Sequence, residues 1–301
     1  LFGGSNNSGA LQFTNVYVSD GAKIGNVFGG GNRAEITTYT NVAITDSEVT
    51  QNVYGGGNQA SVGDNTNVNI YNSIINNVYG GGNAGTIDYT GTGNATNVNI
   101  ENSSTIKTVY GGGCSAAVNG NSSVDIKNST ATNVFGGGEG GNATVNGNTS
   151  VNTEGVDEAD NIGKVSILEN IYGGGDLGKV NGDTVITATK TEVANNIFGG
   201  GNKADIEQNT AVNIFNSTAG TVYGGGMNGA VGGSTSVSIL ENSTITNKVF
   251  GGGSKGDVTG NTIVNLDSSK VVNDLFGGGE AARVKLAKEL QKKPTGRSLF
   301  V

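Results

Sequence analysis

The sequence predicts an all-β protein, a parallel β-helix (solenoid) of about ten stacked coils with three short strands in each coil. Three observations predict it: a motif that recurs about every 26 residues, alternation of apolar and polar residues inside each period, and connecting segments too short to hold a helix. A unit of this size cannot bury its own apolar side chains. Stacking the units gives every strand a neighbour above and below, and ten coils at about 4.8 Å each would make a rod roughly 50 Å long.

The recurring motif is an aliphatic residue, then Phe or Tyr, then three glycines. Its aromatic residues are Phe2, Phe28, Tyr54, Tyr79, Tyr110, Phe135, Tyr172, Phe198, Tyr223, Phe250 and Phe276. Successive aromatics are 25 to 27 residues apart except for two spacings of 31 and 37, which we interpret as insertions. Three glycines at one place in each coil indicate a corner where backbones approach too closely to tolerate a Cβ atom.

The strand before each Asn-Ser turn shows which side chains face the core. In residues 66–70 (TNVNI), Val68 and Ile70 should point inward with Thr66 in the same phase, while Asn67 and Asn69 should point outward. Burying each such aliphatic side chain contributes about 1.5–3 kcal/mol. The Asn-Ser turns are expected to stack from coil to coil and to form side-chain ladders.

The predicted domains are a β-helix repeat domain over residues 1–280 and a helical cap or linker over residues 281–301. Ala281, Val284, Ala287 and Leu290 give the second segment an apolar helical face, and Pro294 ends it. A cap would cover the unpaired strand edges at this end of the solenoid. The first residues already lie inside a motif, so we expect either a fragment of a longer protein or end-to-end self-association.

Charge and composition restrict the partners. The chain carries 17 basic and 25 acidic residues, and residues 280–301 hold six of the basic and two of the acidic ones, so the remainder has 11 against 23. Such an acidic body argues against binding of nucleic acid. No run of about 18 apolar residues exists, so no membrane span is expected. Cys114 is the only cysteine and cannot form an intramolecular disulfide.

The aromatic column is the first candidate binding site. Its proposed ligand-binding residues are Phe28, Tyr54, Tyr79, Tyr110, Phe135, Tyr172, Phe198, Tyr223 and Phe250. In one interpretation the rings form a platform on which sugar rings stack. In the other they stack on one another and seal a corner. Because Phe and Tyr exchange in this column, the ring edge is expected to reach water.

The second candidate is an acidic insertion that could bind Ca²⁺. Glu154, Asp157, Glu158 and Asp160 place four carboxylates within seven residues, and Ca²⁺ takes oxygen ligands of this kind. The segment lacks the spacing of an EF-hand loop, so a solvated acidic loop is the alternative. The other insertion, residues 85–94, is expected to form a surface loop.

Catalysis and ice binding are two further alternatives. The chain has no His, which excludes a Ser-His-Asp or Cys-His arrangement. Polysaccharide lyases and hydrolases share the parallel β-helix, and two carboxylates on adjacent coils could serve as acid and base, so this is the enzymatic rival to a non-enzyme. The column Thr14, Thr40, Thr66, Thr96, Ser122, Thr149, Thr184, Thr210, Thr235 and Thr262 suggests ice binding, but it shares the phase of the core residues.

Residues 53–82 show the whole repeat unit, which resembles the glycine-rich β-strand repeats of large secreted or surface-anchored bacterial proteins. The resemblance covers about residues 1–280 and implies an adhesin-like role at the cell surface, with a glycan or a host surface as ligand. The unit differs from the glycine-rich nonapeptide of calcium-binding repeat toxins in its period and in lacking the Asp. We therefore expect a non-catalytic, secreted or surface-bound scaffold.

Overall fold

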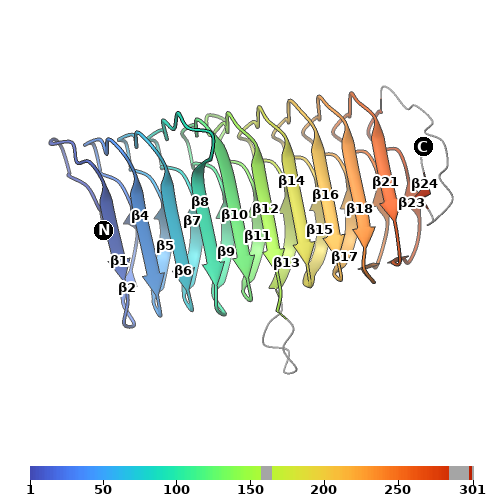
Figure 1. Ribbon diagram of the computed structural model, residues 1–301, viewed down its shortest axis with the longest axis horizontal. Coiled ribbons are helices and arrows are strands. Elements are labelled where there is room, and N and C mark those ends of the chain that lie inside the picture. The colour runs from blue at the N-terminus through green and yellow to red at the C-terminus, as the bar shows by residue number, and fades with distance from the viewer. Residues whose placement is uncertain (157–164, 285–297, 300–301) are drawn as a thin grey trace.

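The computed structural model describes residues 1–156, 165–284 and 298–299, and it confirms a parallel β-solenoid of about ten coils with a period of about 26 residues (Figure 1). The described residues contain strands, turns and bends but no helix. Two long sheets run the length of the rod.

The first sheet has 11 strands and the second has 13. The first contains β1 (Thr14–Val18), β4 (Thr40–Thr45), β6 (Thr66–Tyr71), β8 (Asn94–Glu101), β10 (Asn121–Lys127), β12 (Thr149–Glu154), β14 (Thr184–Thr189), β16 (Thr210–Phe215), β18 (Thr235–Leu240), β21 (Thr262–Leu266) and β24 (Ser298–Leu299). The second contains β2 (Lys23–Ile24), β3 (Val27–Phe28), β5 (Glu48–Tyr54), β7 (Ile74–Tyr79), β9 (Thr105–Tyr110), β11 (Thr130–Phe135), β13 (Val165–Tyr172), β15 (Thr191–Phe198), β17 (Thr218–Tyr223), β19 (Thr244–Ile245), β20 (Val249–Phe250), β22 (Lys270–Val271) and β23 (Leu275–Phe276). All pairs are parallel except β21 with β24.

The strands pair in the register that the repeat predicts. Thr66 pairs with Thr40 on one side and with Thr96 on the other, and Tyr54 pairs with Tyr79. One period is therefore one complete wrap, and equivalent residues lie above one another.

The third expected strand is reduced to a single bridging residue in each coil. Ile36 bridges to Val62, Val62 bridges to Ile87, and the series runs from Leu11 to Val284. Bends follow the bridging residue in most coils, and its neighbours are not in strand geometry, so only one residue per coil belongs to this third sheet line. The described repeat thus extends to Val284.

Apolar side chains form three separate stacks. The largest fills the space between the two sheets and includes Val68 and Ile70, both fully buried as predicted. The second is the series of bridging aliphatic residues, and the third is the aromatic column. Asn67 and Asn69 face outward and are partly buried. The Asn67 side-chain amide donates to Asn41 at 3.0 Å, which continues an amide ladder along the first sheet.

The triglycine corner has no room for side chains. A Cβ atom on Gly55 would overlap the carbonyl oxygen of Gly80 in the next coil, and one on Gly56 would come within 2.9 Å of the Gly82 nitrogen. The first glycine also donates its N–H to the aromatic residue of the next coil, as Gly55 does to the Tyr79 carbonyl at 2.9 Å. Glycine is required here because adjacent backbones are in direct contact.

The Asn-Ser turns stack as predicted. Asn72 has a left-handed φ of 44°, a conformation that Asn tolerates better than most residues. The Ser73 N–H donates to the Ser104 hydroxyl of the next coil at 3.2 Å, and the Ser73 hydroxyl donates to the Tyr71 carbonyl at 2.7 Å. The turn therefore closes one coil and bonds to the next.

The predicted helical cap lies mostly outside the described residues. Of the segment 281–301, the structure describes residues 281–284 and 298–299. In the described part, no helix is long and apolar enough to cross a membrane.

Candidate functional site

The aromatic column forms a continuous ladder of stacked rings. From Phe2 to Phe276, neighbouring ring centroids are 4.6 to 5.1 Å apart, and their planes differ by 3° to 11°. The nine rings from Phe28 to Phe250 are only 3% to 7% exposed, whereas the terminal Phe2 and Phe276 are 40% and 43% exposed. Both faces of each inner ring contact another ring. This geometry favours the structural interpretation of the column, because a sugar ring has no free aromatic face to stack on between the ends.

The rings lie beneath a row of side chains that sequence reasoning missed. We call it the post-glycine row, because each member directly follows a triglycine, or Gly3-Gly4-Ser5 in the first copy. It comprises Asn6, Asn32, Asn58, Asn83, Cys114, Glu139, Asp176, Asn202, Met227, Ser254 and Glu280. Most of its members are partly buried. Cys114 and Met227 pack against the ladder.

Each tyrosine meets the post-glycine residue two coils further on. The Tyr79 hydroxyl donates to Glu139 Oε2 at 2.8 Å, and the Tyr223 hydroxyl donates to Glu280 Oε2 at 3.0 Å. The Tyr172 hydroxyl lies 3.7 Å from the Met227 sulfur. Tyr54 lies near Cys114 by the same offset, but its hydroxyl also accepts from the Asn52 amide at 3.0 Å. Tyr110 interacts more strongly with Glu139, one coil on, than with Asp176, two coils on.

Phenylalanine occurs where the position two coils further on holds Asn or Ser. For Phe2, Phe28, Phe135 and Phe198 that position is respectively Asn58, Asn83, Asn202 and Ser254. These four side chains bond within their own row: Asn58 donates to Asn32 at 2.7 Å, Asn83 to Asn58 at 2.8 Å, Asn202 to Asp176 at 2.6 Å and Ser254 to Glu280 at 2.9 Å. The exchange of Phe and Tyr along the ladder thus correlates with the residue two coils further on, and Tyr79, Tyr172 and Tyr223 bond to it directly. In the sequence this correlation is visible as a Tyr in the ladder whenever the post-glycine residue two coils later is Glu, Asp, Cys or Met.

The most polar part of the ladder surrounds Glu139. Its Oε2 accepts from the Tyr79 hydroxyl and, at 3.2 Å, from the Cys114 thiol. Burial, followed by the hydrogen bond to Glu139, raises the pKa of Tyr79 far above its usual value. Burial also raises the pKa of Cys114, so the thiol stays protonated and is a poor nucleophile. The raised pKa of the Tyr79 phenol and that of the Cys114 thiol both favour the protonated forms of these two groups.

The other tyrosines of the ladder are shifted in the same direction. Burial raises the pKa of Tyr54, Tyr172 and Tyr223 to about 12 each, and that of Tyr110 still further. In every case desolvation of the phenolate is the largest cause.

The structure places only one residue of the predicted calcium site. Glu154 ends β12, and its carboxylate lies 3.6 Å from Lys127 Nζ. Asp157, Glu158 and Asp160 lie outside the described residues. Within residues 1–156 and 165–284, no three His, Cys, Asp or Glu side chains gather closely enough to hold a metal ion.

The threonine column points into the molecule, as its phase predicts. Thr66 is fully buried, and its hydroxyl donates to the Gly80 carbonyl at 2.6 Å. Equivalent bonds recur at the other nine positions, from Thr14 with Gly29 to Thr262 with Gly277. These hydroxyls join the first sheet to the triglycine corner and are not available to an ice surface.

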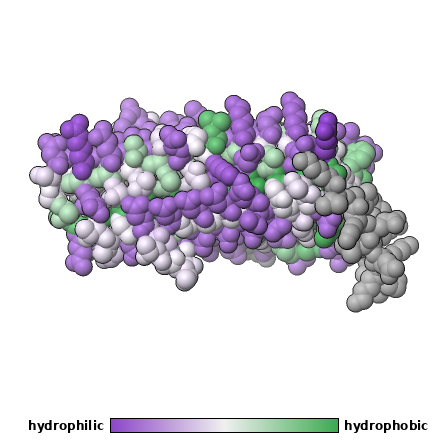
Figure 2. Space-filling model, turned by 90° about the horizontal axis from the view of Figure 1, so that it is seen from above, coloured by the Kyte–Doolittle hydropathy of each residue, from purple (hydrophilic) through white to green (hydrophobic). Residues whose placement is uncertain are grey.

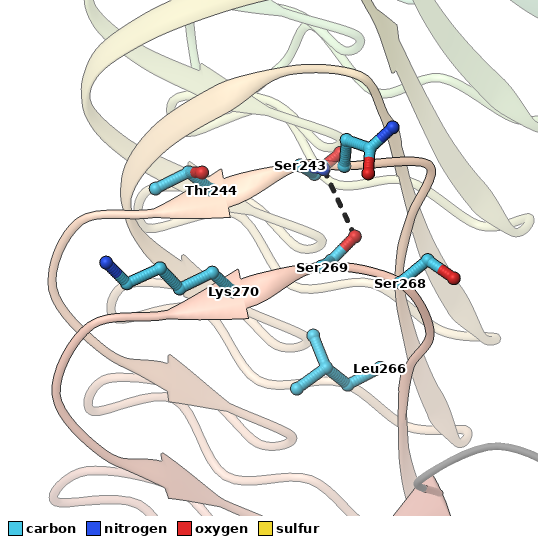
Figure 3. A pocket seen from close by; sticks show the side chains of 7 residues that line it. Ser243, Thr244, Leu266, Ser268, Ser269 and Lys270 are labelled. Carbon is cyan, nitrogen blue, oxygen red and sulfur yellow. Dashed lines mark hydrogen bonds between the residues drawn. The ribbon is translucent and has the colours of Figure 1, made fainter.

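Shallow cavities lie on the outside of the described coils, among them the following three. One of about 410 Å³ crosses β5, β7, β9 and β11, and one of about 330 Å³ crosses β10, β12 and β14. The third, of about 470 Å³, lies beside the last turns, where the Ser243 N–H donates to the Ser269 hydroxyl at 3.1 Å (Figure 3). Its lining also includes Leu266 and Lys270. Sequence analysis missed all three cavities, because their walls come from outward positions that vary between coils.

The cavity on β10, β12 and β14 holds the largest group of charges among the three. Asp125 accepts from Ser123 at 2.9 Å and from Asn152 at 2.9 Å, while Lys127 pairs with Glu154. Two carboxylates and one lysine from adjacent coils thus line one depression. Each of the three already has a partner in the protein.

Comparison with protein-family models, with curated proteins and with solved structures finds no match for this chain. Its structure is therefore the basis for classification: a parallel β-solenoid of about ten coils built from an aromatic-triglycine repeat.

Proposed function

We propose that the chain is a non-catalytic scaffold of the adhesin type, secreted or attached to a cell surface, which binds glycans or another surface ligand through the outside of its coils. One observation carries the proposal. The repeated columns of aromatic, glycine and threonine residues are used in stacking one coil on the next. Many outward positions, apart from the amide ladder of the first sheet, differ from coil to coil, as Glu48, Ile74 and Thr105 do.

A scaffold can use this difference between inner positions that stack the coils and outer positions that vary. A rigid rod held by internal ladders can change its outer side chains without loss of fold. The face shown in Figure 2 is largely hydrophilic, with smaller hydrophobic areas between, so a ligand would meet hydroxyls, amides and scattered apolar side chains. The resemblance to glycine-rich repeats of bacterial surface proteins supports the same role.

A glycan array probed with the purified chain tests the binding role. Binding to a defined set of glycans, lost on unfolding at high temperature, is the expected result. Failure to bind any glycan on the array and any intact cell would contradict it. Cleavage of the chain by a protease added to intact producing cells would support the surface location, and protection until lysis would oppose it.

A polysaccharide lyase or hydrolase is the second candidate, and the cavity with Asp125, Lys127 and Glu154 favours it. Paired carboxylates can act as acid and base on a glycosidic bond. Incubation with a panel of polysaccharides should release new reducing ends if the chain is an enzyme. Loss of that activity in both Asp125→Asn and Glu154→Gln would support catalysis here, and absence of product with every polysaccharide would support the scaffold.

A further inference from the structure

The cavity across β5, β7, β9 and β11 lies between two outward rows of the second sheet. One row brings Glu48, Ile74 and Thr105 to its wall, and the other brings Thr50, Asn76, Lys107 and Thr132. Val49, Ile75 and Ile106 point into the core beneath it and form its floor through their backbones. The depression therefore runs along the rod axis across four successive coils.

The walls combine apolar and hydrogen-bonding groups. Ile74 is 61% exposed, which is unusual for a large aliphatic side chain in this protein. Around it, Thr50, Thr105 and Thr132 supply hydroxyls, and Asn76 supplies an amide. A sugar ring has the complementary surface, with an apolar C–H face and a rim of hydroxyl groups.

The two charged residues that line the cavity differ in whether they already have an ion partner. Glu48 is held by Lys23, whose Nζ lies 2.9 Å from the Glu48 carboxylate. Lys107 is exposed and makes no ion pair with any residue that the structure describes. Because Lys23 neutralises Glu48, Lys107 leaves the cavity with a local positive charge. This local charge attracts an anion, although the chain as a whole has a net charge of −8 and repels one.

We infer that this cavity binds a segment of an acidic polysaccharide, with a sugar carboxylate placed against Lys107 and a neighbouring sugar packed on Ile74. The inference rests on the proposed glycan-binding function and names its ligand class. Successive coils are about 4.8 Å apart, so four coils span about 14 Å. This length, and a cavity volume of about 410 Å³, suit a short run of linked sugars better than a single one.

Binding of uronate-containing and neutral oligosaccharides to the purified chain tests the inference, with Lys107→Gln and Ile74→Ser as variants. Lys203→Gln is the matched control, because Lys203 is also exposed and lies on a different edge, further along the rod. We expect Lys107→Gln to weaken binding of uronate-containing chains by about tenfold or more, since a hydrogen bond to a charged group contributes about 1.5–3 kcal/mol. Lys203→Gln should bind as the parent does, and all three variants should melt at the parental temperature.

The outcomes separate this inference from the proposed function. Binding of neutral glycans alone, or binding of acidic glycans that Lys107→Gln leaves unchanged, would overturn the inference and leave glycan binding intact. Equal losses in Lys107→Gln and Lys203→Gln would show diffuse charge attraction and overturn it as well. Binding of acidic peptides instead, with the same dependence on Lys107, would replace the ligand class, whereas no glycan binding of any kind would remove the proposed function itself.

Discussion

At the scale of single residues, the triglycine corner is the least tolerant part of the chain. A Cβ atom on Gly56, the second glycine of its motif, would come within 2.9 Å of the Gly82 nitrogen, and equivalent contacts recur in successive coils. Gly278 is the second glycine of the last described motif and has no atom within 4 Å of the position that its Cβ would occupy. The two positions are equivalent in the motif but differ in whether a backbone of the described chain packs against them.

This difference gives a direct test of why the glycines recur. We expect Gly56→Ala to lower the free energy of unfolding by roughly 1–3 kcal/mol, because overpacking forces the backbones apart. Gly278→Ala should have almost no effect. Urea denaturation followed by circular dichroism measures both, and similar losses in the two variants would show that the glycines act through chain flexibility and not through coil contact.

The correlation between tyrosine in the aromatic ladder and the residue two coils further on is also a residue-scale property. If Tyr79 acts through Glu139, a double-mutant cycle of Tyr79→Phe with Glu139→Gln should give a coupling energy of about 0.5–1.5 kcal/mol. The same cycle with Asn83→Ala should give none, because Asn83 follows the triglycine of the same coil as Tyr79. Coupling to Asn83 with none to Glu139 would refute the two-coil offset.

At the scale of elements, the first sheet is attached to the triglycine corner by one buried hydroxyl in each coil. Replacing Thr66 by Val keeps the shape of the side chain but leaves the Gly80 carbonyl without this donor. We expect a loss of about 1–3 kcal/mol in unfolding free energy. Thr50→Val is the control, since the Thr50 hydroxyl donates to a carbonyl at an exposed site. A thermal melt in which the two variants coincide would argue that the hydroxyl contributes nothing.

At the scale of the whole molecule, the rod should accept loss of one entire coil. Thr184 pairs with Thr149 on one side and with Thr210 on the other, so deletion of residues 184–209 would bring Thr149 against Thr210 in the same register. We expect a folded rod that is about 4.8 Å shorter by small-angle scattering. Deletion of half a coil should instead abolish cooperative unfolding, because it would place core side chains on the wrong side of the wrap.

Alkaline pH should destabilise the whole rod through its buried tyrosines. Below pH 10 the phenols of Tyr54, Tyr172 and Tyr223 keep their protons in both the folded and the unfolded chain, and their contribution to stability is complete. Between pH 10 and about 12 only the unfolded chain releases them, so the free energy of unfolding falls as pH rises. Melting temperatures measured from pH 8 to 12 should therefore decline above pH 10, and replacement of these three by Phe should flatten that decline.

The sequence by itself determined the solenoid, its period and the inward phase of its aliphatic and threonine columns. These features depend on residue spacing, which a recurring motif displays directly. It predicted three strands per coil where the third is a single bridge, because alternation cannot show how sharply the backbone bends beside Val62. It also left sugar binding by the aromatic column as one of two interpretations, because the exchange of Phe and Tyr suggested that the ring edges reach water.

Only the tertiary structure decided how far apart in the sequence the contacts reach. The bond from Tyr79 to Glu139 spans 60 residues and two coils, an offset that only the stacked coils reveal. The cavity beside Lys107 likewise requires four coils to be stacked before its walls exist. A repeat specifies what each coil contains, while sites that combine different coils depend on the geometry of stacking.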